Sequence, residues 1–91
     1  MIPPSIETAL RMELFTAIML VHKNPDTLDH NCVRMIRMIE SVMKKHENDC
    51  DEEKIMDAAR ILMQSCPVTE AEAEGFLRRM GELGSGAKKA G

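Results

Sequence analysis

The stretch NCVRMIRMIESVMKK, residues 31–45, carries the clearest fold signal in this chain of 91 residues. At about 100° per residue, its apolar side chains fall on one arc of a helix and its basic side chains on the opposite arc. Such segregation is typical of a helix that packs on a core and exposes its far side to solvent. We therefore predict that most methionines here are core residues. The apolar arc, extended one turn toward the N-terminus, consists of Leu28, Cys32, Met35, Ile36, Ile39, Val42 and Met43.

The opposite arc of the same segment is basic. A stripe of this kind is usually a solvated surface, but basic helical faces are also a recurrent footprint for anionic partners. We retain its four cations as a candidate face for an anionic partner: Arg34, Arg37, Lys44 and Lys45.

Composition and periodicity extend the helical interpretation to the whole chain. Hydrophobic residues make up 44% and charged residues 30%, which favours a folded globular domain over disorder. Three polar breaks, KNPDT, ENDCD and SCPVT, separate four segments with helical periodicity, and no segment alternates as a strand would. The sequence predicts an all-α fold, a small antiparallel bundle of four helices at about residues 6–22, 27–46, 51–65 and 70–83. We expect residues 1–84 to form a single domain and residues 85–91 a flexible C-terminal tail.

Capping residues locate the ends of these helices. The sequence TEAE is a capping box, with Thr69 as N-cap and Glu72 three residues later. We also expect N-caps at Ser5, at Asp26 or Thr27, and at one of Asn48, Asp49 and Asp51, and a terminating glycine at Gly84.

The first helix departs from the one-sided pattern. One arc carries Ile6, Leu10, Leu14, Ala17, Ile18, Leu20 and Val21, and a second arc carries Met12, Phe15 and Met19. A helix that is apolar on two faces must be buried on two faces. Either the other helices wrap both sides, or the second face contacts another protein. We favour the second alternative, because monomers seldom leave large apolar patches open, so Met12, Phe15 and Met19 are the candidate protein-binding or dimer interface.

Motifs that carry chemistry are missing from the sequence. No closely spaced cysteine pair suits structural zinc, and no Glu-x-x-His suits a di-iron bundle. The acidic run NDCDEE differs from a calcium loop, with Lys54 at the glycine position and Arg60 at the bidentate glutamate position. No nucleophile elbow or phosphate loop occurs. We expect no metal, no cofactor and no enzymatic activity, while the sequence leaves the role of Cys50 and His46 open.

The choice of partners follows from charge and from apolar content. The net charge is −3, and the segment starting at residue 70 begins with acidic residues that phosphate would repel, so nucleic acid is disfavoured. The longest apolar run, AIMLV, is far too short to span a membrane.

The N-terminus lacks the pattern of a signal peptide. Three irregularly spaced cysteines fit reduced thiols, and hence a cytoplasmic location.

Together these features predict a non-enzymatic protein–protein interaction module. We expect a small cytoplasmic regulator, adaptor or inhibitor that binds a larger protein through an apolar helix face, as a homodimer. The alternative is a transcriptional regulator associated with nucleic acid, which would use the basic face of residues 27–46.

Overall fold

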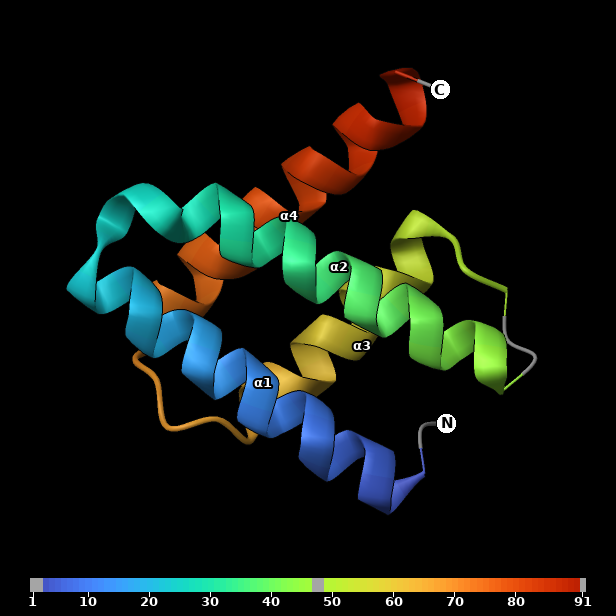
Figure 1. Ribbon diagram of the computed structural model, residues 1–91, viewed down its shortest axis with the longest axis horizontal. Helices are drawn as coiled ribbons and strands as arrows, with labels where there is room; N and C mark the ends of the chain where they lie inside the picture. The colour runs from blue at the N-terminus through green and yellow to red at the C-terminus, as the bar shows by residue number, and fades with distance from the viewer. Residues whose placement is uncertain (1–2, 47–48, 91) are drawn as a thin grey trace.

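The computed structural model describes the backbone of residues 3–46 and 49–90, and the side chains of those residues as far as Gly84. Every regular element in this part of the chain is helical, which confirms the predicted all-α bundle of four helices (Figure 1). The elements are α1 (Pro4–Lys23), the short 3-10 helix η1 (Pro25–Thr27), α2 (Leu28–Lys45), α3 (Glu52–Gln64) and α4 (Glu70–Ala90).

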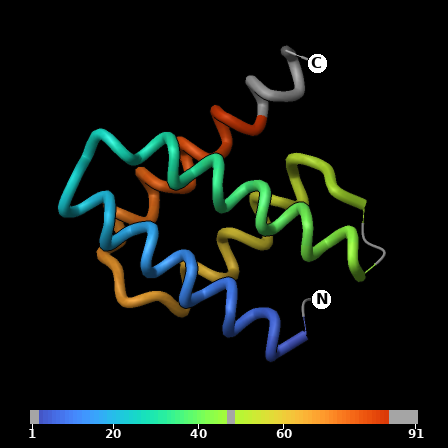
Figure 2. The backbone as a smooth tube through the Cα atoms, viewed as in Figure 1, coloured from blue at the N-terminus to red at the C-terminus, as the bar shows by residue number. Residues whose placement is uncertain are grey.

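The helices form two layers. α1 and α2 run antiparallel on either side of η1 and lie nearer the viewer, with α3 and α4 behind them (Figures 1 and 2). The shortest dimension of the molecule is 17 Å. That thickness fits two helices stacked face to face, because packed helix axes lie about 8–10 Å apart. Both α2 and α3 pack against all three other helices.

The core lies between these layers and draws on all four helices. The apolar arc predicted for α2 is confirmed, since Leu28 and Val42 are half-buried and its other members are buried. Methionine contributes much of the packing, as predicted. The buried apolar residues are Leu10, Leu14, Ala17 and Ile18 of α1; Cys32, Met35, Ile36, Ile39 and Met43 of α2; Ile55, Ala58, Ala59, Leu62 and Met63 of α3; and Phe76 and Met80 of α4.

Side-chain caps begin α3 and α4. The Asp51 carboxylate accepts the backbone N–H of Lys54 at 2.8 Å, and Asp51 is therefore the N-cap of α3. At α4 the Thr69 hydroxyl accepts the N–H of Glu72 at 3.1 Å, and the Glu72 carboxylate accepts the N–H of Thr69 at 2.9 Å. The capping box is confirmed. Hydrogen bonding with Thr69, above all from its backbone N–H, lowers the pKa of Glu72.

The predicted N-cap of α1 is wrong. Ser5 does not begin α1: the helix starts at Pro4, because proline suits the first helical position with its fixed φ and missing N–H. The N-cap of α2 is confirmed in position, since Thr27 is its N-cap residue, but the Thr27 hydroxyl donates to the carbonyl of Asn24 at 2.8 Å and caps no N–H of the helix.

The predicted end of α4 is also wrong. Gly84 does not terminate the helix, which continues to Ala90, because Gly84 keeps a backbone that any residue can adopt instead of the positive φ of a terminating glycine. The flexible tail predicted at residues 85–91 stays a prediction, because the side chains of residues 85–90 and all of residue 91 lie outside the described part of the chain.

Replacing Gly75 with alanine should stabilise the fold. Gly75 lies inside α4, and a Cβ atom added there meets nothing within 4 Å. Alanine removes the entropic penalty of glycine in a helix, so we expect Gly75→Ala to raise the free energy of unfolding by roughly 0.5–1 kcal/mol. The measurement is the urea midpoint followed by circular dichroism. An unchanged or lower midpoint would contradict the open space and helical backbone at this position.

Candidate protein-binding surfaces

The side of α1 that points away from the core carries the three residues that the sequence analysis selected. Met12, Phe15 and Met19 have exposed fractions of 67%, 38% and 44%. Their spacing of three and four residues places them along one side of the helix, whereas Leu14 and Ala17 on the opposite side are fully buried. We call Met12, Phe15 and Met19 the outer face of α1.

The neighbours of α1 border this face without covering it. α1 packs against α2 and α3. On its flanks Glu13 forms an ion pair with Arg34 of α2, and the His22 ring contacts the Glu72 carboxylate of α4. Within the described part of the chain, the exposed fractions above exclude the alternative in which the other helices wrap α1 on both sides. The outer face is therefore exposed to solvent in the described part of the chain.

The basic face of α2 is less concentrated than the sequence pattern indicated. All four cations are exposed, but Arg34 pairs with Glu13 of α1. Lys44 and Lys45 belong to the last turn of α2, where cations complement the helix dipole. About 10 Å of helix separates Arg37 from Lys44. The structure thus places Arg34 and Arg37 at one end of the face and the two lysines at the other.

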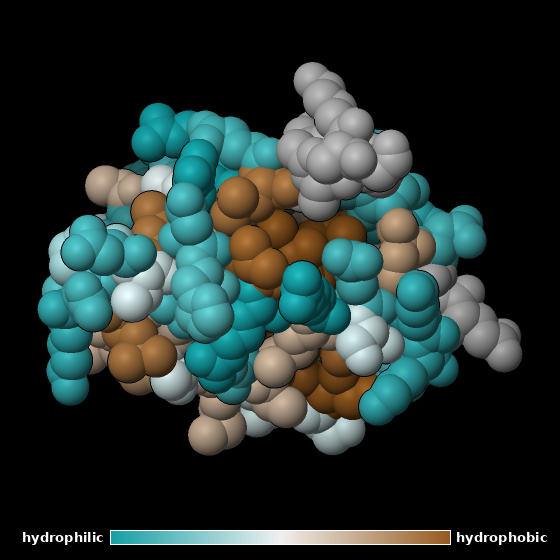
Figure 3. Space-filling model, turned by 45° about the horizontal axis from the view of Figure 1, so that its top comes forward, coloured by the Kyte–Doolittle hydropathy of each residue, from teal (hydrophilic) through white to brown (hydrophobic). Residues whose placement is uncertain are grey.

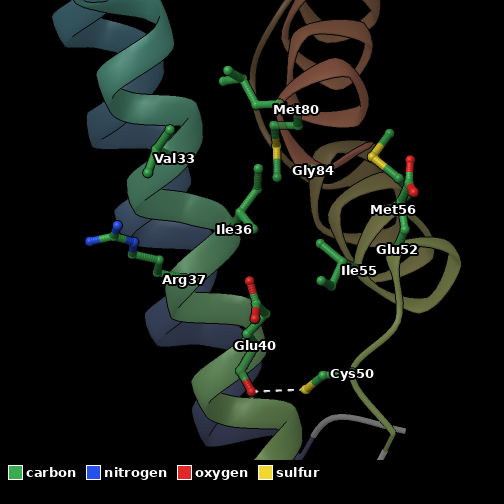
Figure 4. A pocket seen from close by; sticks show the side chains of 11 residues that line it. Val33, Ile36, Arg37, Glu40, Cys50, Glu52, Ile55, Met56, Met80 and Gly84 are labelled. Atoms are coloured by element: carbon green, nitrogen blue, oxygen red, sulfur yellow. Dashed lines mark hydrogen bonds between the residues drawn. The ribbon is translucent and has the colours of Figure 1, made fainter. Parts of the chain in front are cut away.

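A groove that the sequence analysis missed lies between α2, α3 and α4. Its volume is about 550 Å³. Ile36 of α2 and Ile55 of α3 point toward each other across it, the Glu40 carboxylate points into it, and Arg37 points away (Figure 4). We call this the interhelical groove. Its apolar lining comes from Val33, Ile36, Ile55, Met56, Met80 and Leu83.

Two glycines of α4 help to make room for the groove. A Cβ atom at Gly81 would lie 3.6 Å from the Met56 methyl group, and one at Gly84 would lie 3.9 Å from the side chain of Glu52. Met56, Glu52 and Gly84 all line the groove. Because these two positions of α4 carry no side chain, α4 adds nothing there to the space beside Met56 and Glu52. Figure 3 turns this side of the molecule forward and shows hydrophobic residues surrounded by hydrophilic ones.

A network of charged side chains joins α4 to the start of α2, beside the groove. Arg79 of α4 binds both carboxylate oxygens of Asp29, one of them at 2.6 Å, and donates to Glu82 of its own helix at 2.6 Å. The hydrogen bonds from Arg79 hold the pKa of Asp29 below its usual value. This contact joins α2 to α4 one turn before Val33, the first groove residue on α2.

The three cysteines differ in their surroundings. Burial raises the pKa of Cys32 to about 12, and its thiol lies 3.9 Å from the carbonyl of Phe76. Burial also raises the pKa of Cys66. The Cys50 thiol donates to the carbonyl of Glu40 at 3.1 Å, which ties the segment before α3 to α2. Cys50 forms no hydrogen bond with His46, so the structure does not join the pair that the sequence left open.

Comparison with known proteins identifies no relative. No family model, curated protein or solved structure matches this chain. Across residues 3–46 and 49–90, no group of three or more histidine, cysteine or acidic side chains is placed to hold a metal ion. In the same residues no helix has the length and apolar character needed to cross a membrane.

The groove was missed because its walls come from three distant segments. The sequence pattern correctly assigned Ile36 and Ile55 to inward arcs, and both are nearly buried. The pattern did not show that the side chains of these arcs leave a groove between α2, α3 and α4. The available signal was the pair of glycines, Gly81 and Gly84, on the inward side of α4.

Removing the Asp29 carboxylate should change how stability depends on pH. A carboxyl group whose pKa is lowered by folding stabilises the native state above its unfolded pKa, and this contribution is lost as the pH falls through the folded pKa. Asp29→Asn should therefore lower the urea midpoint at pH 7, and the difference from wild type should shrink as the pH falls below the usual carboxyl pKa of about 3.9. The loss should be small, because both partners are partly exposed.

Asp57→Asn is the matched control for this prediction. Asp57 pairs with Arg60 at 2.9 Å inside α3, so its carboxylate joins no two helices. We expect a smaller change at pH 7 from this variant. If Asp29→Asn instead retains its full effect at pH 2.5, roughly a unit below the usual carboxyl pKa, the contact with Arg79 is not the source of the stability.

Proposed function

We propose that this protein is a non-enzymatic protein-interaction module, a small cytoplasmic regulator, adaptor or inhibitor, whose contact surface is the outer face of α1. The observation that carries the proposal is the exposure of Met12, Phe15 and Met19 on a helix whose opposite side is fully buried. Methionine and phenylalanine are enriched at the centres of protein interfaces. Large apolar side chains grouped on one helix face are typical of helix-on-helix recognition.

The spacing along α1 favours a second copy of the chain as the first partner. Residues 5, 8, 12, 15, 19 and 22 alternate steps of three and four, which is the pattern of paired helices in coiled coils. From Ser5 to Met19, these positions carry no charged side chain. An uncharged strip of this kind can approach its own copy without burying an unpaired charge.

An antiparallel pair suits this strip better than a parallel one. In an antiparallel arrangement centred near Phe15, Met12 faces Met19 of the second copy, and the two phenylalanine rings meet close to the two-fold axis. Sulfur–aromatic contacts are favourable in such a cluster. We therefore propose an isologous dimer with antiparallel α1 helices.

The dimer should be weak. A helix of 20 residues offers a face about 30 Å long. The area that two such faces bury against each other is at the low end of the range for specific interfaces. We expect a dissociation constant of roughly 10–100 µM. A larger protein with a complementary apolar helix would compete for the same face, which is how an adaptor or inhibitor of this kind would be regulated.

Replacing Phe15 and Met19 with serine should abolish self-association. The double variant removes two of the three large apolar side chains from the strip, so sedimentation velocity at roughly 200 µM should show a monomer where wild type shows a dimer. Met12→Lys gives a second test, because it places a charge in the strip at the most exposed position and leaves the core untouched.

Ile61→Ser is the matched control. Ile61 is 55% exposed on α3 and lies outside the strip, so the dimer should persist in this variant. Circular dichroism confirms that each variant is folded. A wild-type protein that stays monomeric up to millimolar concentration, or an Ile61 variant that dissociates equally, would overturn the proposed dimer.

The basic face of α2 gives weaker support to a regulator associated with nucleic acid. Arg34 already has a carboxylate partner in Glu13, and the two ends of the face lie about 10 Å apart along the helix. A binding face for phosphate normally concentrates its cations.

A further inference from the structure

The interhelical groove combines an apolar floor with negative charge at its edge. Ile36 and Ile55 face each other across it, and the Glu40 carboxylate points into the same space (Figure 4). The one cation on the lining, Arg37, points away. A ligand that fills this groove must therefore present apolar groups to the isoleucines and a positive charge to Glu40.

Acidic side chains continue beyond the groove over the start of α3. A second, more open hollow of about 560 Å³ shares Glu52 and Met56 with the groove. Its rim adds Asp51, Glu53 and Asp57. The only cation on that rim is Arg60, which pairs with Asp57. An extended cationic partner can use both hollows, whereas a small amine would use only the groove.

We infer that the interhelical groove binds a basic amphipathic helix of a partner protein. Along α2 the groove extends from Val33 to Glu40, which is about 10 Å. That length accommodates apolar side chains from two turns of a docked helix, at positions i, i+3 or i+4, and i+7. Met56 and Met80 line the groove, and methionine adapts to apolar groups of varied shape. A lysine or arginine on the flank of the helix then meets Glu40.

The proposal does not depend on the outer face of α1. None of the groove residues belongs to α1, so the dimer variants and the groove variants test different surfaces. Loss of dimerisation with retention of binding at the groove, or the reverse, would separate the two proposals.

A synthetic helix tests the inference directly. The probe is a fluorescein-labelled peptide of about four helical turns, made only of leucine and lysine, with leucines at i, i+3, i+4 and i+7. Fluorescence anisotropy with the full-length protein should give saturable binding. A peptide of identical composition, reordered so that its leucines no longer share one face, should bind at least tenfold more weakly, a factor equivalent to about 1.4 kcal/mol.

Charge reversal separates groove binding from general attraction to an acidic protein. Glu40→Lys should weaken the peptide roughly tenfold or more, and Glu40→Gln should have a smaller effect of the same sign. Glu70→Lys is the matched control: it makes the same change of net charge at an exposed position in the first turn of α4, outside the groove. We expect this variant to bind almost as wild type does.

A variant that fills the groove supplies a test independent of charge. Gly84 lines the groove within α4, so Gly84→Phe should place a ring in it without lowering helix propensity. This variant should lose the peptide while circular dichroism shows it folded. The inference is overturned if wild type does not bind, if Glu40→Lys and Glu70→Lys weaken binding equally, or if the folded Gly84 variant binds unchanged.

Discussion

The burial of the apolar arc of α2 is the interaction on which the rest of the structure depends. α2 packs against α1, α3 and α4, and Cys32, Met35 and Ile39 at the centre of its arc have no exposed surface. Because this arc meets α1 on one side and α3 and α4 on the other, α1 uses only its inner side to complete the core. As a consequence, the outer face of α1 remains exposed. The same geometry turns the basic side of α2 to solvent, where one of its cations can bridge to Glu13.

Most of the fold could be predicted because its signals are local. A period of 3.6 residues placed the arc of α2, and the pair Thr69 and Glu72 marked the start of α4 within four residues of sequence. The errors arose where two local rules competed. Serine is a good N-cap, which favoured Ser5, but proline favours the first helical position and α1 starts at Pro4. Gly84 was treated as a terminator, although glycine ends a helix only when its φ is positive.

The two candidate surfaces differ in how much the sequence could show. The outer face of α1 belongs to one helix, so its three apolar residues were visible as a second arc, and the structure shows that all three are exposed. The groove depends on how three helices pack against one another, and the periodicity of each helix does not determine that arrangement. Its acidic edge was equally hidden, because Glu40 and Glu52 are twelve positions apart in the chain and line the same groove only through the packing of α3 on α2.

The separation of these surfaces has a consequence for binding. In a two-fold dimer formed through α1, each protomer keeps its own groove, because the groove lies on α2, α3 and α4. A partner with two basic helices could then occupy both grooves, and its second contact would form at the high effective concentration of an intramolecular event. Dissociation of the weak dimer would remove this increase in affinity for the two-helix partner without altering either groove. Self-association through Phe15 would thus control the strength of a contact made elsewhere on the molecule, and a competitor for the outer face of α1 would release a partner that it never touches.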